Sequence, residues 1–529
     1  MSGTPPTIAF TAPAPIQTGS SPSSSSTTST LNQQWIKTTH FFPAAWPRSN
    51  NRSARSDSYH PPPNQSDAQP SHPDQDPLDA KAIEATRREL AFEEWKARCA
   101  KPKGASKTLF EDLRDMSRPE FHQPRIQQAR QHNEAQLWGC VERIVPVYEA
   151  PLHGEPSSAG NPSYDQPGIT LVIGHANGFH KEVWEPTLQS LVRSIAQSPE
   201  YSSKIRIDEI WNFDCTHAGE AGSINRENLG EVISWFDHPR DILQLLDHYL
   251  PSLPPPKSNQ GMPTIKGPQW LPPTLKRTGQ GQGRKHRRLV AVGHSFSGAA
   301  LAMLTSSFPD LFEGTILVDP AFSPPERELF YAREGELPFE SKGQPDASKL
   351  EDYKLSKGAV VRKDNFANLL AARKSFLSKP FFQAWDPRVL ELHLRFALRP
   401  LLLPASEGSV VEQIASKDVP LTLSNSKWHE ASAFSNTWMS KFGWYGLGQR
   451  RHKGWTGMIS MEGGFYSQAV QDLITSIPGG LFYTMPGGHL VAMEQPDALG
   501  EKLAELIHTQ TTKSEKGGRQ GPQIPAPRL

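Results

Sequence analysis

Cysteine is scarce in this sequence of 529 residues, and the three that are present stand far apart, at Cys99, Cys140 and Cys215. No pair of them has the spacing of a zinc knuckle or of a redox CxxC motif. An odd and sparse set also argues against a disulfide framework and favours a reducing compartment.

Charge of one sign and long apolar runs are lacking as well. The 56 basic residues nearly balance the 55 acidic ones, so nothing indicates a nucleic-acid or acidic partner. No apolar stretch approaches the roughly 20 residues of a membrane-spanning helix. The N-terminus lacks the basic flank and apolar run of a secretory signal. We therefore expect neither a transmembrane segment nor a secreted protein.

Hydrophobic residues make up only 36% of the chain, and the shortfall is uneven. Residues 1–78 are rich in Ser, Thr, Pro and Asn, a composition that cannot bury enough apolar area to offset the entropy of ordering. We predict a disordered tail at 1–78, a helical extension at 79–134 and a flexible C-terminal tail at 509–529.

Short apolar runs mark the strands of a buried sheet. Residues 169–173, 289–292 and 315–318 are typical of buried parallel strands. Residues 297–307, between the last two runs, are small and apolar enough for a helix packed on the sheet. Strand, helix and strand at this spacing predict a parallel βαβ unit.

The sheet pattern is interrupted once. Residues 324–450 carry helical patterns with many aromatic side chains, so we predict a core at 135–323 and 451–508 with a mostly helical cap between its two parts. A stretch rich in Pro, Gly and basic residues at 251–287 is expected to be a surface insertion. The predicted fold class is α/β, with a doubly wound, mostly parallel sheet.

The motif GHSFSG at 293–298 is the strongest local signal, because it follows an apolar strand and precedes a helix. This is the setting of a nucleophile elbow, where a sharp turn admits only small residues two positions from the nucleophile. Ser297 replaces the second glycine of G-x-S-x-G but is still small. We therefore predict that Ser295 is a nucleophile.

Two other motifs supply the remaining parts of such a site. The motif GHANGF at 174–179 follows an early strand, where a loop backbone N–H completes an oxyanion hole. We assign the two donors to Asn177 and Phe296. A Gly-Gly-His motif follows a last predicted strand at 481–484, and its His489 is the expected base that takes the proton of Ser295 and returns it to the leaving group.

The acid of the triad is less well defined by the motifs. Asp319 comes directly after the strand at 315–318, whereas the more usual place, one strand later, has only Glu462. Because geometry rather than sequence position defines a triad, we favour Asp319 over Glu462, with Glu430 as a third candidate.

These motifs carry a family resemblance. The segments GHANGFHKEVWEP, VGHSFSG, LVDPAFSP and PGGHLVAMEQP resemble the α/β-hydrolase superfamily and, more narrowly, fungal peroxisomal lipases and toxin-biosynthesis esterases. The resemblance covers about residues 135–508 and implies the α/β-hydrolase fold. The departures are Ser297 in place of glycine and the missing Asp near Glu462.

The expected function is that of a serine hydrolase acting on an apolar ester through an acyl-enzyme, with no metal or other cofactor. A thioesterase, an amide hydrolase or a C–C bond hydrolase would use the same residues. A binding protein that kept the fold without catalysis is the alternative from another class.

The last three residues suggest where the protein is located. Pro527-Arg528-Leu529 is a variant of the small–basic–leucine tripeptide that the peroxisomal import receptor reads. We therefore expect a peroxisomal protein, with the cytoplasm as the alternative.

Overall fold

The computed structural model describes most of the predicted core and part of the predicted cap. The described residues are 35–49, 53–57, 126–146, 168–230, 233–252, 271–272, 274–322, 351–401, 419–435, 441–448, 452–462 and 468–516. The C-terminal tripeptide and most of the predicted helical extension at 79–134 lie outside them. Within that extension, residues 126–131 are helical.

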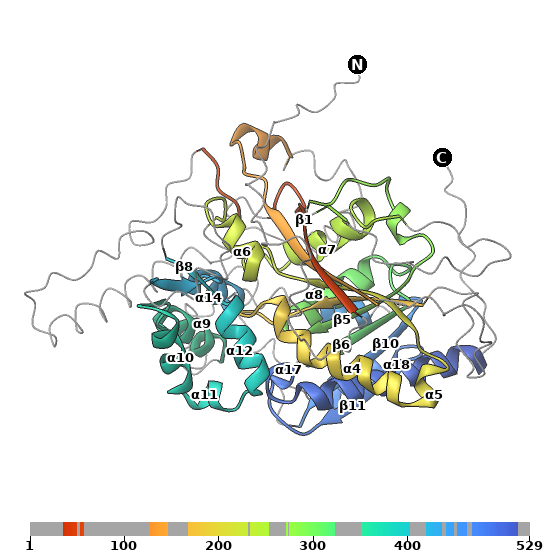
Figure 1. The fold of residues 1–529 in the computed structure, drawn as a ribbon. Coiled ribbons are helices and arrows are strands. Elements are labelled where there is room, and N and C mark those ends of the chain that lie inside the picture. The colour runs from red at the N-terminus through yellow and green to blue at the C-terminus, as the bar shows by residue number, and fades with distance from the viewer. Residues whose placement is uncertain are drawn as a thin grey trace, which may run out of the picture.

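An eight-stranded sheet forms the centre of the fold (Figure 1). In spatial order its strands are β1 (Trp35–Pro43), β2 (Trp138–Pro146), β4 (Ile207–Phe213), β3 (Ile169–Gly174), β5 (Arg288–His294), β6 (Gly314–Val318), β10 (Trp455–Met461) and β11 (Leu481–Met485). β2 pairs antiparallel with both of its neighbours, and every pair from β4 to β11 is parallel. The carboxyl ends of the parallel strands therefore meet at one edge, where such sheets bind ligands.

Helices cover both faces of this sheet. Leu171 and Ile173 of β3 pack with α4 (Glu185–Gln197) and α18 (Pro496–Lys516), whereas Val172 packs with α7 (Asp237–His248) and α8 (Phe296–Ser307). Because successive strand residues point to opposite faces, the sheet is buried on both sides, which confirms the doubly wound α/β class. The other elements of this region are the 3-10 helices Lys181–Trp184 and Gln282–Arg284, α5 (Pro199–Ser202), α6 (Gly219–Asn225), α16 (Gln468–Ser476) and α17 (Val491–Glu494).

Where the structure describes the chain between β6 and β10, it forms helices and one small sheet, most of which lie to the left of the large sheet in Figure 1. The helices are α9 (Glu351–Val361), α10 (Leu369–Leu377), α11 (Pro380–Gln383), α12 (Pro387–Phe396), α14 (Lys427–Ser435) and α15 (Lys441–Gly448). The small sheet has the order β7 (Asn365–Phe366), β9 (Leu421–Leu423) and β8 (Leu398–Pro400). We call the region from α9 to α14 the cap.

One prediction about the N-terminal region is wrong. Residues 35–43 were expected to lie in a disordered segment at 1–78, but they form β1, the edge strand of the large sheet. Phe42 is fully buried, and a Cβ added at Gly139 of β2 would lie 2.3 Å from its ring. Pairing with a strand about 100 residues away along the chain stabilises this segment, and local composition does not reveal such pairing.

Two predicted boundaries also differ. α18 continues to Lys516, so the first part of the tail predicted at 509–529 is helical. Within the predicted surface insertion at 251–287, Leu275 is buried and its N–H donates to the carbonyl of Phe41 in β1. The edge strand therefore holds part of the insertion against the core.

Candidate active site

Ser295 stands at the sharp turn between β5 and α8. Its φ of 54° is a conformation that a non-glycine residue rarely adopts. A Cβ added at Gly293 would lie 2.7 Å from the carbonyl oxygen of Ser297. A Cβ added at Gly298 would lie 2.9 Å from the carbonyl oxygen of Gly293. A side chain at either position would clash with the backbone, which explains why both residues are glycine. The strained turn has the geometry of a nucleophile elbow.

Three side chains form a continuous hydrogen-bonded chain from this turn. Nε2 of His489 lies 2.8 Å from Oγ of Ser295, and Nδ1 of His489 lies 2.5 Å from Oδ2 of Asp319. A carboxylate only accepts, so Nδ1–H donates to Asp319 and Nε2 can accept the hydroxyl proton of Ser295. Each proton therefore points from serine to histidine and from histidine to the carboxylate, as a serine nucleophile and its base require.

The structure positions His489 from two sides. The imidazole lies on the loop after β11, and its side chain is 28% exposed, so the ring can be reached from solvent. Nε2 of His294, the residue before Ser295, lies 2.8 Å from the carbonyl oxygen of His489. Burial lowers the pKa of His294 to about 3, so this ring is neutral and donates from Nε2. The turn that carries Ser295 thus also holds the loop that carries His489.

The three candidate acids have different surroundings. Asp319 is fully buried and accepts a hydrogen bond from the backbone N–H of Met461 at 3.3 Å in addition to that from His489. Glu462 is exposed at the end of β10. Glu430 lies on α14, where it forms an ion pair with Arg362. Asp319, the favoured candidate, is the one that contacts His489.

The two predicted oxyanion donors follow neighbouring strands in register. Gly174 of β3 pairs with Gly293 of β5, and Asn177 and Phe296 each come three residues later. Phe296 is the first residue of α8, so its N–H precedes the intrahelical hydrogen bonds. The side-chain amide of Asn177 donates to the carbonyl of Glu430 in the cap at 3.1 Å, so this contact ties the loop after β3 to the cap.

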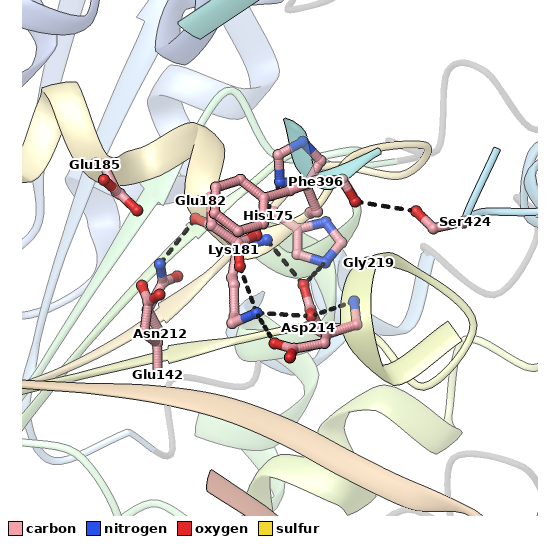
Figure 2. Close-up of polar contacts among 12 residues, drawn as sticks. Glu142, His175, Lys181, Glu182, Glu185, Asn212, Asp214, Gly219, Phe396 and Ser424 are labelled. Atoms are coloured by element: carbon pink, nitrogen blue, oxygen red, sulfur yellow. Dashed lines mark hydrogen bonds and ion pairs between the residues drawn. The ribbon is translucent and has the colours of Figure 1, made fainter. Parts of the chain in front are cut away.

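A buried lysine behind this loop was not assigned a role from the sequence (Figure 2). Nζ of Lys181 is fully buried and donates to Glu182 at 2.5 Å, to Glu220 at 3.1 Å and to Asp214 at 3.2 Å. Burial alone would lower the pKa of Lys181, but the carboxylates, Asp214 first, raise it well above its usual value. The charged cluster fixes the chain that follows the oxyanion loop to the end of β4. In the sequence, the adjacent Lys181 and Glu182 at the end of the segment HANGFHKE were the sign of this cluster. Their burial, however, cannot be seen from the sequence.

Comparison with known proteins gives distant relatives. No family model matches the chain. The type I acyl-CoA thioesterase mpaH of Penicillium roqueforti (strain FM164) is 25% identical over 301 residues, which cover 55% of this chain and 53% of that protein. The peroxisomal membrane protein LPX1 of Saccharomyces cerevisiae is 23% identical over 343 residues, 64% of this chain and 75% of that protein. The chain thus spans about half the length of the first relative.

A solved structure agrees with the topology described above. The peroxisomal α/β-hydrolase Lpx1 from Saccharomyces cerevisiae matches with a TM-score of 0.51 and 17% identity, over 94% of this chain and 92% of that chain. Identity this low is informative about the fold alone. With its doubly wound sheet and this structural match, the chain has the α/β-hydrolase fold that its motifs predicted.

Proposed function

We propose that this protein is a serine hydrolase that cleaves a carboxylic ester through an acyl-enzyme intermediate. The observation that carries the proposal is the chain of two short contacts from Ser295 through His489 to Asp319. A nucleophile, a base and an acid in hydrogen-bond contact are the parts that acyl transfer needs. The strained turn at Ser295 supports the same reading, because backbone strain concentrates at functional sites.

Each residue has a definite role in this mechanism. Oγ of Ser295 attacks the ester carbonyl while Nε2 of His489 takes its proton, and Asp319 stabilises the imidazolium that forms. The backbone N–H groups of Asn177 and Phe296 donate to the oxyanion of the tetrahedral intermediate. His489 then protonates the leaving alcohol. A water molecule activated by His489 hydrolyses the acyl-enzyme and restores Ser295.

The aromatic character of the cap supports an apolar acyl group in the proposed substrate. Phe179, on the oxyanion loop, packs against Trp385 and His393 of the cap, with ring centroids 5.5 and 6.1 Å apart. Buried cap side chains, including Phe376 and Phe382, continue this cluster. Pockets for small molecules are mostly lined by such side chains. A thioester is the second candidate substrate, because the relatives named acyl-CoA thioesterase match this chain over half of its length.

A peroxisomal location is proposed on separate grounds. The relative from Saccharomyces cerevisiae, LPX1, is named as peroxisomal, and the tripeptide Pro527-Arg528-Leu529 would be read by the import receptor. In the described ranges, no helix has both the length and the apolar character needed to cross a bilayer. The full chain fused behind a fluorescent protein should enter peroxisomes, and a diffuse cytosolic signal would contradict the proposal.

Hydrolysis by purified protein tests the proposed activity. p-Nitrophenyl esters of increasing acyl length and acyl-CoA thioesters should be turned over, with an initial burst if deacylation is slow. Ser295→Ala should lower kcat by at least about 10³-fold. Ser306→Ala is the matched control, because that hydroxyl lies on the same helix and bonds only to Ala302 within it. Full turnover by folded Ser295→Ala protein would refute the assignment.

A further inference from the structure

Ser297 occupies the position where the elbow motif ordinarily has its second glycine. The side chain is fully buried, and its hydroxyl donates to the carbonyl oxygen of His175 at 2.6 Å. His175 lies on the loop after β3, two residues before the proposed oxyanion donor Asn177. A side chain on α8 thus contacts the backbone of the neighbouring loop directly.

The same hydroxyl has a second partner. Nε2 of His238, on α7, lies 3.0 Å from Oγ of Ser297. Because the single hydroxyl proton of Ser297 goes to the carbonyl of His175, Oγ must accept from His238, which fixes the proton of that ring on Nε2. Burial lowers the pKa of His238 to about 3, so the ring is neutral at working pH. The His238 ring also stacks on Phe296, with centroids 5.6 Å apart.

His175 in turn is held by its own side chain. Its ring is fully buried, Nδ1 donates to the carbonyl of Ala176 at 2.8 Å, and Nε2 accepts from the backbone N–H of Cys215 at 3.1 Å. Cys215 belongs to the loop after β4. The loops after β3 and β4 and the start of α8 therefore meet at His175 and Ser297.

The packing around Ser297 is as specific as its hydrogen bonds. A Cβ added at Gly174 would lie 2.6 Å from Cβ of Ser297 and 2.8 Å from its Oγ. The serine therefore occupies the space that a side chain at 174 would take. This close approach brings the start of α8 against the end of β3, the two places from which the oxyanion donors come.

We propose that Ser297 is a positioning residue of the oxyanion hole: its hydroxyl ties the loop that carries Asn177 to the helix that begins at Phe296. The tie sets the separation between the two backbone N–H groups, and His238 holds the hydroxyl in place. The inference rests on the proposed function and deepens it, because it explains how the two donors are kept aligned on a developing oxyanion.

Loss of this hydroxyl should lower kcat and the affinity for a transition-state analogue but leave KM nearly unchanged. Ser297→Ala and Ser297→Gly should each lower kcat about tenfold, less than the ~10²–10³-fold cost of removing an oxyanion donor. KM should change by less than about twofold, because the ground-state carbonyl gains little from the oxyanion hole. Affinity for a trifluoromethyl ketone, which forms a tetrahedral oxyanion on Ser295, should fall in parallel with kcat.

The controls separate positioning from general damage. Ser306→Ala, on the same helix, should leave kcat and inhibitor affinity unchanged. His238→Gln keeps a donor at the place of Nε2 and should stay nearer to the wild-type kcat than His238→Leu, which has none. If the Ser297 variants fail to fold, the comparison of His238→Gln with His238→Leu still tests whether the Ser297 hydroxyl has a positioning role.

Each outcome has a definite meaning. Parallel losses in kcat and in inhibitor affinity at unchanged KM support the proposal. Folded Ser297→Ala protein with wild-type kcat and inhibitor affinity overturns it, as does a rise in KM with kcat unchanged or equal activity of His238→Gln and His238→Leu. A wild-type protein that neither turns over esters nor binds the ketone overturns the proposed function itself, and the inference with it.

Discussion

The turns after β6 and after β10 offer a direct comparison. The two strands are parallel neighbours in the sheet, and a carboxylate follows each of them, Asp319 after the first and Glu462 after the second. Asp319 is fully buried and contacts His489, whereas Glu462 is exposed to solvent. Similar places at the same edge of one sheet thus give two carboxyl groups with very different surroundings.

The backbone explains why the two turns differ. The N–H groups of both residues continue the ladder, that of Asp319 to Ile459 of β10 and that of Glu462 to Met485 of β11, but Asp319 has a positive φ of 38°. Its carboxylate is then in reach of the N–H of Met461. The side chain of Glu462, by contrast, is exposed to solvent. Which carboxylate can orient a histidine therefore depends on how each turn leaves the sheet.

The largest effect is expected from Asp319→Asn. An amide cannot stabilise the imidazolium and can favour the wrong tautomer of His489, so kcat should fall about 10⁴-fold while KM changes little. Steady-state kinetics on one ester measure this. The double variant Asp319→Asn/Glu462→Asp should be no more active, because the exposed position does not reach His489. Recovery of activity in the double variant would show that the turn after β10 can supply the acid.

A smaller effect is expected from the histidine that links the two loops. His294→Leu removes the donor to the carbonyl of His489 and should lower kcat about tenfold, which is the loss expected from one neutral hydrogen bond. His294→Gln keeps a donor and should lose less. Because burial holds the pKa of His294 at about 3, neither variant should shift the pH profile of kcat above pH ~5. A shifted profile would show that His294 titrates with the reaction.

The smallest effect is expected from Glu462→Gln. The side chain is exposed, so kcat should change by less than about twofold and Tm by less than about 2 °C. Kinetics and thermal unfolding of the purified variant check both values. A loss as large as that of Asp319→Asn would reverse the comparison and move the acid to the later strand.

Local patterns predicted the parts of the site that local structure determines. The elbow, the oxyanion loop and the loop of His489 each follow a short apolar strand, and those strands are β5, β3 and β11. The start of α12 is local as well, because the side chain of Asp386 accepts from the N–H of Arg388 and Pro387 takes the first helical position. In each case residues close in sequence determine the feature.

Features that depend on distant contacts were missed or left open. β1 is stabilised by pairing with β2, which lies about 100 residues further along the chain. The choice of Asp319 over Glu462 depends on burial against another strand, and the charge of the buried Lys181 is balanced by its neighbour Glu182 together with the distant Asp214 and Glu220. Such contacts leave no periodic pattern in the sequence, so composition and motif spacing could not predict them.

The measurement that tests the central claim most directly is identification of the residue that carries the covalent adduct. The full-length protein is treated with a fluorophosphonate probe and digested, and the modified residue is located by mass spectrometry. We predict a single adduct on Ser295, absent from Ser295→Ala and formed orders of magnitude more slowly in Asp319→Asn. A folded protein that takes no probe, or takes it at another residue, would contradict the proposed triad.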